Sequence, residues 1–303
     1  MNERLCLLEV HAHPDDEASK GAGVAAKYAS EGVWTVLVTC TGGEAGEILN
    51  PAADDAETRA NLAAVRLTEL RQSVAAIGYG ALRLLGYRDS GMAGTAENSD
   101  PRSFAQADLD EATGRLVEII RQERPQVVIT YGDDQSRYPH PDHVRVHEIS
   151  VLAFERAGEP KWYPEAGEPW QPAKLYYVGW SRSRLEALHA AFEARGFESP
   201  FKRWLEGGDE GPDPFTTRVD VSAHLSRVRA SLLAHRTQVD PDSFWLRLPD
   251  EALQEAFPWE EFVLARSHVA PEANGRRGEH EATETPRAWE GDLFAGVRDP
   301  AVH

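Results

Sequence analysis

Residues 5–17 read LCLLEVHAHPDDE, a short apolar run that leads directly into two histidines and three carboxylates. The run Leu5–Val10 is short and almost wholly apolar, which is typical of a buried strand. Pro14 favours the first position of a helix because its φ angle is already close to the helical value. A buried strand that ends in polar side chains and then enters a helix is the first unit of an alternating α/β fold.

Four further apolar runs resemble strands, at residues 34–40 (WTVLVTC), 81–87 (ALRLLGY), 126–132 (QVVITYG) and 174–180 (KLYYVGW). Amphipathic segments that resemble helices separate them, at residues 18–30, 54–77, 109–123 and 141–157. The alternation predicts a Rossmann-like core over residues 1–182, with a mostly parallel sheet and helices on both faces. Residues 183–268 are expected to form a C-terminal helical or irregular extension that completes the substrate site. Residues 269–303 lack apolar periodicity and are expected to form a loose tail.

The composition argues against several classes of partner. The chain has 32 Lys and Arg against 50 Asp and Glu, a formal charge of −18, which disfavours binding to nucleic acid or to an anionic membrane. The two cysteines, Cys6 and Cys40, lie within apolar runs, which favours buried free thiols in a reducing compartment. No signal peptide and no apolar segment of transmembrane length is visible, so we expect a cytoplasmic protein. Whether it forms a homo-oligomer stays open.

A second polar cluster follows the fourth apolar run, in the segment DDQSRYPHPDHVRVHE at residues 133–148. In an open parallel sheet, ligands bind beyond the carboxyl ends of the strands, where the winding direction reverses. If the first three strands wind one way and the fourth returns beside the first, both clusters lie at that point. We therefore expect two distant segments to form one site.

The first cluster has the residue types of a catalytic metal site. If Pro14 begins a helix, His13 and Asp16 lie about one turn apart and can bind the same ion. Together with one histidine of the second cluster they would form a three-ligand site with open positions, the pattern of catalytic zinc. Asp15 projects differently and could accept a proton from an activated water. His11 is expected to be a packed histidine at the end of the sheet.

Spacing alone does not choose the third ligand. His143 and His147 are four residues apart on one helix, a spacing that can bind zinc, and His140 lies three residues before His143. Taken without the first cluster, histidines that merely cap or cover a helix would explain this segment equally well.

The paired motifs HAHPDDE (residues 11–17) and YPHPDHVRVH (residues 138–147) resemble the PIG-L/LmbE-like zinc deacetylases, which remove acyl groups from the amine of glucosamine-type sugars. TCTGGEAGEILNPA (39–52), RDSGM (88–92) and KLYYVGW (174–180) are similar to the mycothiol S-conjugate amidases. The resemblance implies a Rossmann-like fold with one Zn²⁺ per chain at the ends of the first and fourth strands. Another divalent ion such as Fe²⁺ is the alternative, because His and carboxylate ligands suit several metals.

The resemblance also implies roles for individual residues. By motif position, the metal ligands are His13, Asp16 and His143. Asp15 is the general base, and His140 stabilises the oxyanion or protonates the leaving amine. Asp142 orients His140, and Tyr138 polarises the carbonyl. The implied substrate-binding residues are Lys20, Glu47, Arg66, Asp89, Met92 and Arg137.

The implied reaction is hydrolysis of the amide between an S-conjugated N-acetylcysteine and the glucosamine amine of a mycothiol-type conjugate, a step of detoxification. The substrate is then a small glucosamine-containing pseudo-disaccharide. Lys20 favours this reading, because the amidases carry a lysine after HPDDE. The loop at residues 90–110 is closer to the N-acetylglucosaminyl-inositol deacetylases, and Arg137 stands where the family usually has glycine. Deacetylation, or trimming of thiol conjugates in natural-product biosynthesis, is therefore the alternative function.

A different class of enzyme is suggested by GAGVAA at residues 21–26, which matches the dinucleotide-binding pattern G-x-G-x-x-G/A. These glycines do not follow the first strand directly, since residues 11–20 intervene. We interpret them as positions of close helix packing rather than as a cofactor site.

Overall fold

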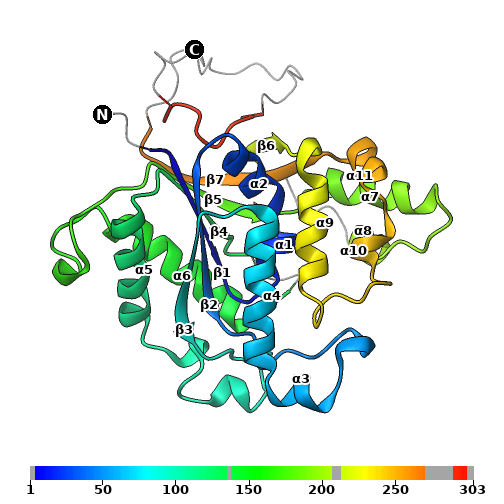
Figure 1. The fold of residues 1–303 in the computed structure, drawn as a ribbon. Helices are drawn as coiled ribbons and strands as arrows, with labels where there is room; N and C mark the ends of the chain where they lie inside the picture. Colours follow the sequence, from blue (N-terminus) through cyan, green and yellow to red (C-terminus); the bar gives the residue numbers. More distant parts are fainter. Residues whose placement is uncertain (1–3, 135–137, 207–212, 270–288, 299–303) are drawn as a thin grey trace.

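The fold is built around one seven-stranded sheet in the order β3-β2-β1-β4-β5-β7-β6 (Figure 1). The computed structural model describes residues 4–134, 138–206, 213–269 and 289–298. The strands are β1 (Cys6–His11), β2 (Trp34–Thr41), β3 (Ala81–Tyr87), β4 (Val127–Tyr131), β5 (Lys174–Gly179), β6 (Thr217–Asp220) and β7 (Trp259–Ser267). Strands β1 to β5 are parallel, as predicted, whereas β7 runs antiparallel to both β5 and β6.

Helices cover both faces of the sheet (Figure 1). The helices are α1 (Asp16–Ser19), α2 (Ala22–Ser30), α3 (Ala56–Ala60), α4 (Leu62–Ile77), α5 (Leu109–Glu123), α6 (Pro141–Arg156), α7 (Arg182–Glu193), α8 (Lys202–Leu205), α9 (Leu225–Ala234), α10 (Phe244–Arg247) and α11 (Asp250–Ala256). None of the helices in the described part of the chain has the length and apolar character that a membrane span needs.

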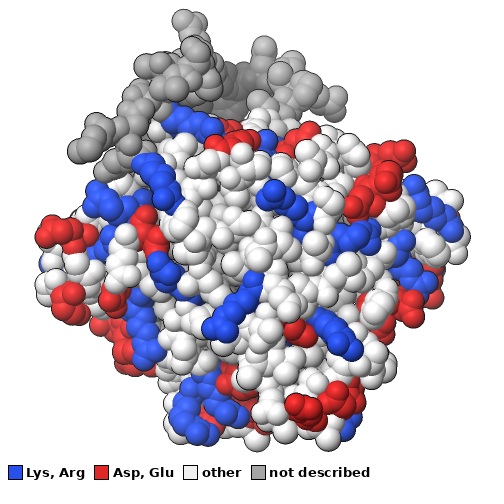
Figure 2. Space-filling model, in the orientation of Figure 1, with Lys and Arg blue, Asp and Glu red and all other residues white. Residues whose placement is uncertain are grey.

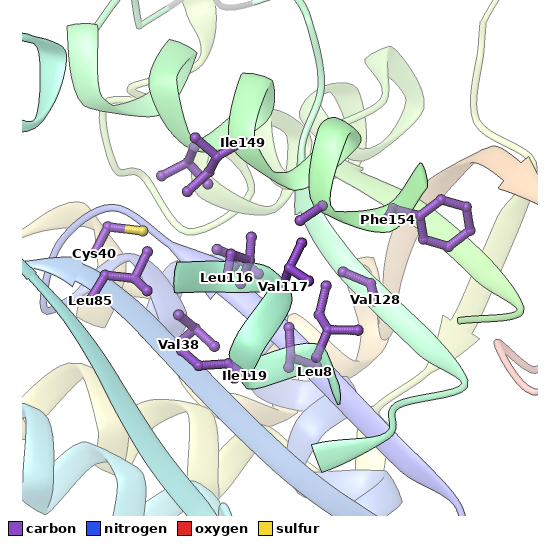
Figure 3. Close-up of a cluster of buried hydrophobic side chains, with 14 of the residues drawn as sticks. Leu8, Val38, Cys40, Leu85, Leu116, Val117, Ile119, Val128, Ile149 and Phe154 are labelled. Carbon is purple, nitrogen blue, oxygen red and sulfur yellow. The ribbon is translucent and has the colours of Figure 1, made fainter. Parts of the chain in front are cut away.

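The core has two layers because successive side chains of a strand point to opposite faces. On one face, Leu8 of β1 and Val128 of β4 pack against Leu116 of α5 and Ile149 of α6 (Figure 3). On the other face, residues such as Leu7 pack toward α2. Strands buried on both faces read as continuous apolar runs, which is why β1, β2 and β4 were visible in the sequence.

The C-terminal segment departs from the sequence prediction. Residues 183–268 were expected to be helical or irregular, but they also contain β6 and β7, which extend the sheet. Strand β7 was missed because Glu260 and Glu261 interrupt its apolar pattern. Both carboxylates have partners that are distant in the sequence: Glu260 accepts hydrogen bonds from the backbone of α2, and Glu261 pairs with Arg218 at 2.7 Å.

The expectation of a loose tail is wrong for residues 289–298. Leu293 and Phe294 are fully buried, and Phe294 lies edge-on to Tyr28 with the ring centroids 5.1 Å apart. The Tyr28 hydroxyl accepts a hydrogen bond from the Leu293 N–H at 2.8 Å, and the Glu290 carboxylate pairs with Lys174. Two adjacent apolar residues are thus enough to dock this segment against α2. Residues 270–288 and 299–303 lie outside the described residues.

The surface and the thiols agree with the composition. Cys6 and Cys40 are buried free thiols, as predicted. On the face that carries α4 and α9, Lys and Arg side chains are spread singly among uncharged residues, and Asp and Glu gather mainly nearer the rim (Figure 2). The excess of negative charge therefore does not form one continuous acidic surface on this face.

The docked segment predicts a measurable stability effect. Phe294→Ala should lower the free energy of unfolding by about 3–5 kcal/mol, because it removes a fully buried aromatic ring. Urea denaturation followed by tryptophan fluorescence measures the change. Leu233→Ala is the control, since Leu233 is 53% exposed and its loss should change the value by less than about 0.5 kcal/mol. Equal values for the two variants would show that the segment is not docked in solution.

Candidate metal centre

The loops after β1 and β4 meet at one edge of the sheet. These strands are parallel neighbours, with Leu7 paired to Val127 and Glu9 to Ile129, so their carboxyl ends lie side by side. The first loop carries His13 into α1, and the second leads to α6, which begins at Pro141. The adjacency of β1 and β4 that the sequence analysis assumed is confirmed by the strand order.

Three buried side chains converge at this edge. His13 Nδ1 lies 3.3 Å from Asp16 Oδ2, and His143 Nε2 lies 3.5 Å from Asp16 Oδ1. One ligand atom from each residue lies within 4.8 Å of the others, so the three atoms can contact a single ion. The structure therefore brings together the three residues that motif position had implied as ligands.

The donor set fits a divalent cation. His143 Nε2 is buried and has no hydrogen-bond partner among the described residues, which is costly for a polar atom unless something else occupies that space. Two imidazoles and one carboxylate with positions left open are the ligands of catalytic zinc sites. His147 is directed elsewhere, because its Nδ1 lies 3.0 Å from the Tyr131 carbonyl oxygen.

Asp142 holds His13, which differs from the role that the resemblance implied for it. His13 Nε2 lies 3.1 Å from Asp142 Oδ2, and the same oxygen accepts the backbone N–H of Ser90 at 3.0 Å. The Ser90 hydroxyl donates to the other oxygen. Asp142 contacts His140 through its backbone instead, because the Asp142 N–H donates to His140 Nδ1 at 3.2 Å. A carboxylate on the far nitrogen of a ligand histidine fixes the ring and its tautomer, so the structure points to His13 as the residue that Asp142 orients.

His140 is a neutral hydrogen-bond donor in this arrangement. Burial and then the charge of His13 lower the pKa of His140 to about 4. Its Nδ1 accepts the backbone N–H of Asp142, so the single proton of the neutral ring is on Nε2. Such a ring can donate a hydrogen bond to an oxyanion, but it lacks the second ring proton that an imidazolium could transfer to an amine.

The remaining charges of the centre are paired. Burial alone would lower the pKa of His13, but hydrogen bonds to Asp142 and Asp16 raise it well above the usual value. Burial alone would raise the pKa of Asp16, but the Lys20 ammonium, 2.7 Å from Oδ1, holds it well below the usual value. Asp16 is therefore ionised and able to bind a cation.

Asp15 is held in a strained conformation beside the cluster. Its φ angle is 112°, in the left-handed region that residues other than glycine rarely adopt. The Asp15 N–H donates to Glu17 Oε2 at 3.0 Å, and Arg66 Nη2 lies 3.2 Å from Asp15 Oδ2. Burial raises the pKa of Asp15, yet its side chain keeps 31% exposure and is open to solvent at the site. These are properties of a carboxylate that can accept a proton.

The Glu17 carboxylate that holds Asp15 is itself part of a buried network. Glu17 Oε1 accepts the Ser73 hydroxyl at 2.5 Å and lies 2.5 Å from His235 Nε2. Glu17 and His235 are both fully buried. His235 follows α9 and Ser73 belongs to α4, so three elements support the loop. Sequence analysis missed His235 because its partner is 218 residues away and no motif surrounds it.

Arg66 has a structural position rather than a free one. It is 2% exposed, and its guanidinium donates to the carbonyl oxygens of Gly43 and Pro14 as well as to Asp15. Gly43 has a φ of +66°, and a Cβ there would lie 2.3 Å from Arg66 Nη1. Only glycine allows this close approach. Arg66 therefore joins the loops after β1 and β2.

Tyr138, implied to polarise the carbonyl, and the other residues that were implied as substrate contacts surround the centre unevenly. Asp89 is buried, with Oδ1 3.6 Å from His13 Nε2. Met92 and Tyr138 are exposed, and the Tyr138 ring centroid lies 5.2 Å from that of His143. Glu47 is exposed. Arg137 lies outside the described residues.

The glycine-rich segment is not a cofactor loop. The Glu260 carboxylate accepts the N–H groups of Gly23 at 2.9 Å and Val24 at 2.8 Å. A carboxylate therefore occupies the N-terminus of α2, where a dinucleotide-binding fold would place its pyrophosphate. A Cβ on Gly23 would lie 2.8 Å from Val221, which supports the interpretation of these glycines as positions of close packing.

Comparisons with known proteins agree with this geometry. Residues 8–154 match the family model PIG-L, described as GlcNAc-PI de-N-acetylase. The chain is 43% identical to a mycothiol S-conjugate amidase of Streptomyces coelicolor, over 99% of this chain and 100% of that protein. It is 40% identical to a 1D-myo-inositol 2-acetamido-2-deoxy-alpha-D-glucopyranoside deacetylase of Geodermatophilus obscurus, over 96% of this chain and 97% of that protein. An N,N'-diacetylchitobiose deacetylase from Pyrococcus horikoshii has a similar fold, with a TM-score of 0.60 over 86% and 83% of the chains and 18% identity.

The convergence of ligands predicts the effect of histidine substitutions on metal content. His143→Ala should lose the bound divalent ion, because one of three ligands is removed. His147→Ala is the matched control, one turn further along α6, and should keep it. Elemental analysis of the dialysed proteins measures the ratio of metal to chain. Retention by His143→Ala together with loss by His147→Ala would reject the ligand set.

The buried pair of Glu17 and His235 predicts a pH-dependent stability. Although burial opposes both shifts, the charge of His235 lowers the pKa of Glu17 and the charge of Glu17 raises that of His235. The pair therefore contributes fully between the ordinary values of 4.5 and 6.5. Its contribution is lost as the pH rises through the raised pKa of His235, or falls through the lowered pKa of Glu17.

His235→Gln should lower the free energy of unfolding by about 3 kcal/mol near pH 5.5, and by less as the pH approaches 9. Urea denaturation at several pH values measures the difference from the unmodified protein. His189→Gln is the control, because its partner Glu193 is 64% exposed and an exposed pair contributes little. A difference for His235→Gln that does not change with pH would contradict the charged pair.

Proposed function

Since this chain belongs to the PIG-L family of GlcNAc-PI de-N-acetylases, we propose that it is a zinc-dependent amidase of mycothiol-type conjugates. The bond cleaved joins an S-conjugated N-acetylcysteine to the amine of glucosamine. The observation that carries the proposal is the convergence of His13, Asp16 and His143 beside the partly exposed carboxylate of Asp15. A cation site next to a proton acceptor is the requirement of metal-assisted amide hydrolysis.

His13, Asp16 and His143 would hold the zinc ion. When bound, zinc would polarise the amide carbonyl and lower the pKa of a water at the site. Asp142, supported by Ser90, would keep His13 in the orientation and tautomer that binding requires.

Asp15 would act as the general base. It would accept one proton of the attacking water while the new C–O bond forms at the amide carbon. When the C–N bond breaks, the same proton would pass to the glucosamine nitrogen, so that the products are a free amine and a carboxylic acid, which then loses its own proton to solvent at neutral pH. Arg66 and Glu17 hold the carboxylate and the backbone of Asp15, which leaves it little freedom to turn away from the water.

His140 and Tyr138 would stabilise the charge on the oxygen of the former carbonyl. His140 can donate from Nε2 in its neutral form. Burial raises the pKa of Tyr138, so its hydroxyl keeps its proton and can donate as well. Hydrogen-bond donors aimed at a developing oxyanion typically contribute a factor of about 10²–10³ to the rate.

The choice between amidase and deacetylase rests on similarity and on Lys20. The identity to the amidase of Streptomyces coelicolor is 43% over the whole of both chains, against 40% to the deacetylase of Geodermatophilus obscurus. The Lys20 ammonium lies 2.7 Å from Asp16 Oδ1 and is partly exposed, so it would be available to the acyl part of a substrate. Removal of an acetyl group from the same amine is the second candidate, favoured by the deacetylase relatives.

Product analysis tests the proposed substrate. The zinc-loaded protein should release an S-substituted N-acetylcysteine from a mycothiol S-conjugate faster than acetate from N-acetylglucosaminyl-inositol, as measured by liquid chromatography with mass spectrometry. The reverse order would assign the chain to the deacetylases.

Asp15→Asn tests the proposed base on whichever substrate is turned over. We expect the rate to fall by about 10²–10⁴-fold with the metal content unchanged, because the amide cannot accept a proton. Glu118→Gln is the control, since that side chain is exposed on α5 and belongs to none of the implied site residues. An Asp15→Asn protein with nearly unchanged turnover would reject the role of Asp15.

A further inference from the structure

An aromatic cavity lies beside the metal loop, on the side of the C-terminal segment. Its volume is about 100 Å³. Aromatic rings form much of its wall, and they come from Trp180, Phe201, Phe244, Trp245, Phe257 and Trp259. Ala18 and Ser19 of α1 also line it. An apolar cavity of 150 Å³ in another protein binds benzene, so this space is of the order of one small ring or alkyl group.

The cavity lies at the same edge of the sheet as the metal centre. Trp180 follows the carboxyl end of β5, and Trp259 begins β7, which runs antiparallel to β5. On α1, Ala18 comes two residues after Asp16, and a helix rises only about 1.5 Å per residue. Less than one turn of helix therefore separates the cavity wall from a proposed metal ligand.

Arg184 contributes a cation to this apolar space. Its guanidinium carbon lies 4.3 Å from the centroid of the Trp180 ring and 5.9 Å from that of Phe257. Within the described parts of the chain, its guanidinium makes no hydrogen bond, although burial lowers its pKa. Arg184 is partly buried, and the charges of Glu260 and Glu261 act on it without forming an ion pair, so its guanidinium keeps hydrogen-bond donors that a ligand could use.

The acidic residues near Arg184 are already engaged. Glu260 accepts two backbone N–H groups at the start of α2. Glu261 pairs with Arg218 at 2.7 Å and accepts the Ser181 N–H. Neither carboxylate makes an ion pair with Arg184 among the described residues, so donors of Arg184 are available for a ligand.

We propose that this cavity binds a small apolar carboxylate, with the apolar group between the aromatic rings and the carboxylate on Arg184. The acid released by the proposed hydrolysis, an S-substituted N-acetylcysteine, belongs to this chemical class, and that source of ligand rests on the proposed function. An apolar acid unrelated to the reaction is the other source. In both cases the site is separate from the three metal ligands.

Ligand binding to the zinc-loaded full chain tests the proposal. The probes are S-benzyl-N-acetylcysteine, 3-phenylpropanoate and the neutral 3-phenylpropanamide. Their affinities are measured by calorimetry and by the fluorescence of the tryptophans in the cavity wall. Both carboxylates should bind at least about tenfold more tightly than the amide, as expected for a charge-assisted hydrogen bond. Absence of binding, or equal binding of acid and amide, overturns the proposal without the need of any variant.

Two substitutions locate the site. Arg184→Met should weaken both carboxylates about tenfold and leave the amide unchanged, whereas Arg182→Met, on the exposed side of α7, should change neither. The metal-free His143→Ala protein should still bind 3-phenylpropanoate. Carboxylate binding that survives Arg184→Met but disappears in His143→Ala would place the ligand on the metal and reject the cavity.

The two carboxylates distinguish the source of the ligand. Tighter binding of S-benzyl-N-acetylcysteine than of 3-phenylpropanoate supports a site for the acid product, and equal affinity supports a site for apolar acids in general. Binding of 3-phenylpropanoate needs no amidase activity. A failure of the proposed function would therefore appear in the product analysis and not in this experiment.

Discussion

The ionised carboxylate of Asp16 is the constraint on which the rest of the site depends. It is buried between His13 and His143, and the Lys20 ammonium lies 2.7 Å from its Oδ1. Burial of such a charge is costly unless several partners are held in place. The parallel pairing of β1 and β4 brings those partners together, since each strand delivers one histidine to the same edge of the sheet.

The parallel half of the fold and the ligand set could be predicted from the sequence because their signals are local. Strands buried on both faces read as apolar runs, and HPDD and HPDH each place metal-binding side chains within one helical turn. The missed features depend on partners that are distant in the sequence. Glu260 is compatible with a strand because its carboxylate accepts N–H groups at the start of α2, and the role of His235 follows only from its contact with Glu17. No pattern within one segment reveals such pairs.

Asp142 contacts two histidines through different groups. It follows His140 by two residues, and the resemblance implied that it orients this histidine. At the start of α6 the chain turns so that the backbone N–H of Asp142 meets His140, while the carboxylate turns away toward His13 and Ser90. The same residue thereby contacts the proposed ligand His13 through its side chain and sets the tautomer of His140 through its backbone.

The C-terminal segment belongs to the same structural unit as the metal loop, although it follows the predicted core. Its strands extend the sheet, Glu260 receives the N–H groups at the start of α2, and His235 supports the carboxylate that holds Asp15. The last two contacts reach the polypeptide between β1 and β2, which carries Asp15 and Asp16. A boundary near residue 182 would separate the strained loop from the groups that maintain its conformation. We therefore interpret the C-terminal segment as a support for catalytic geometry, in addition to a wall for ligands.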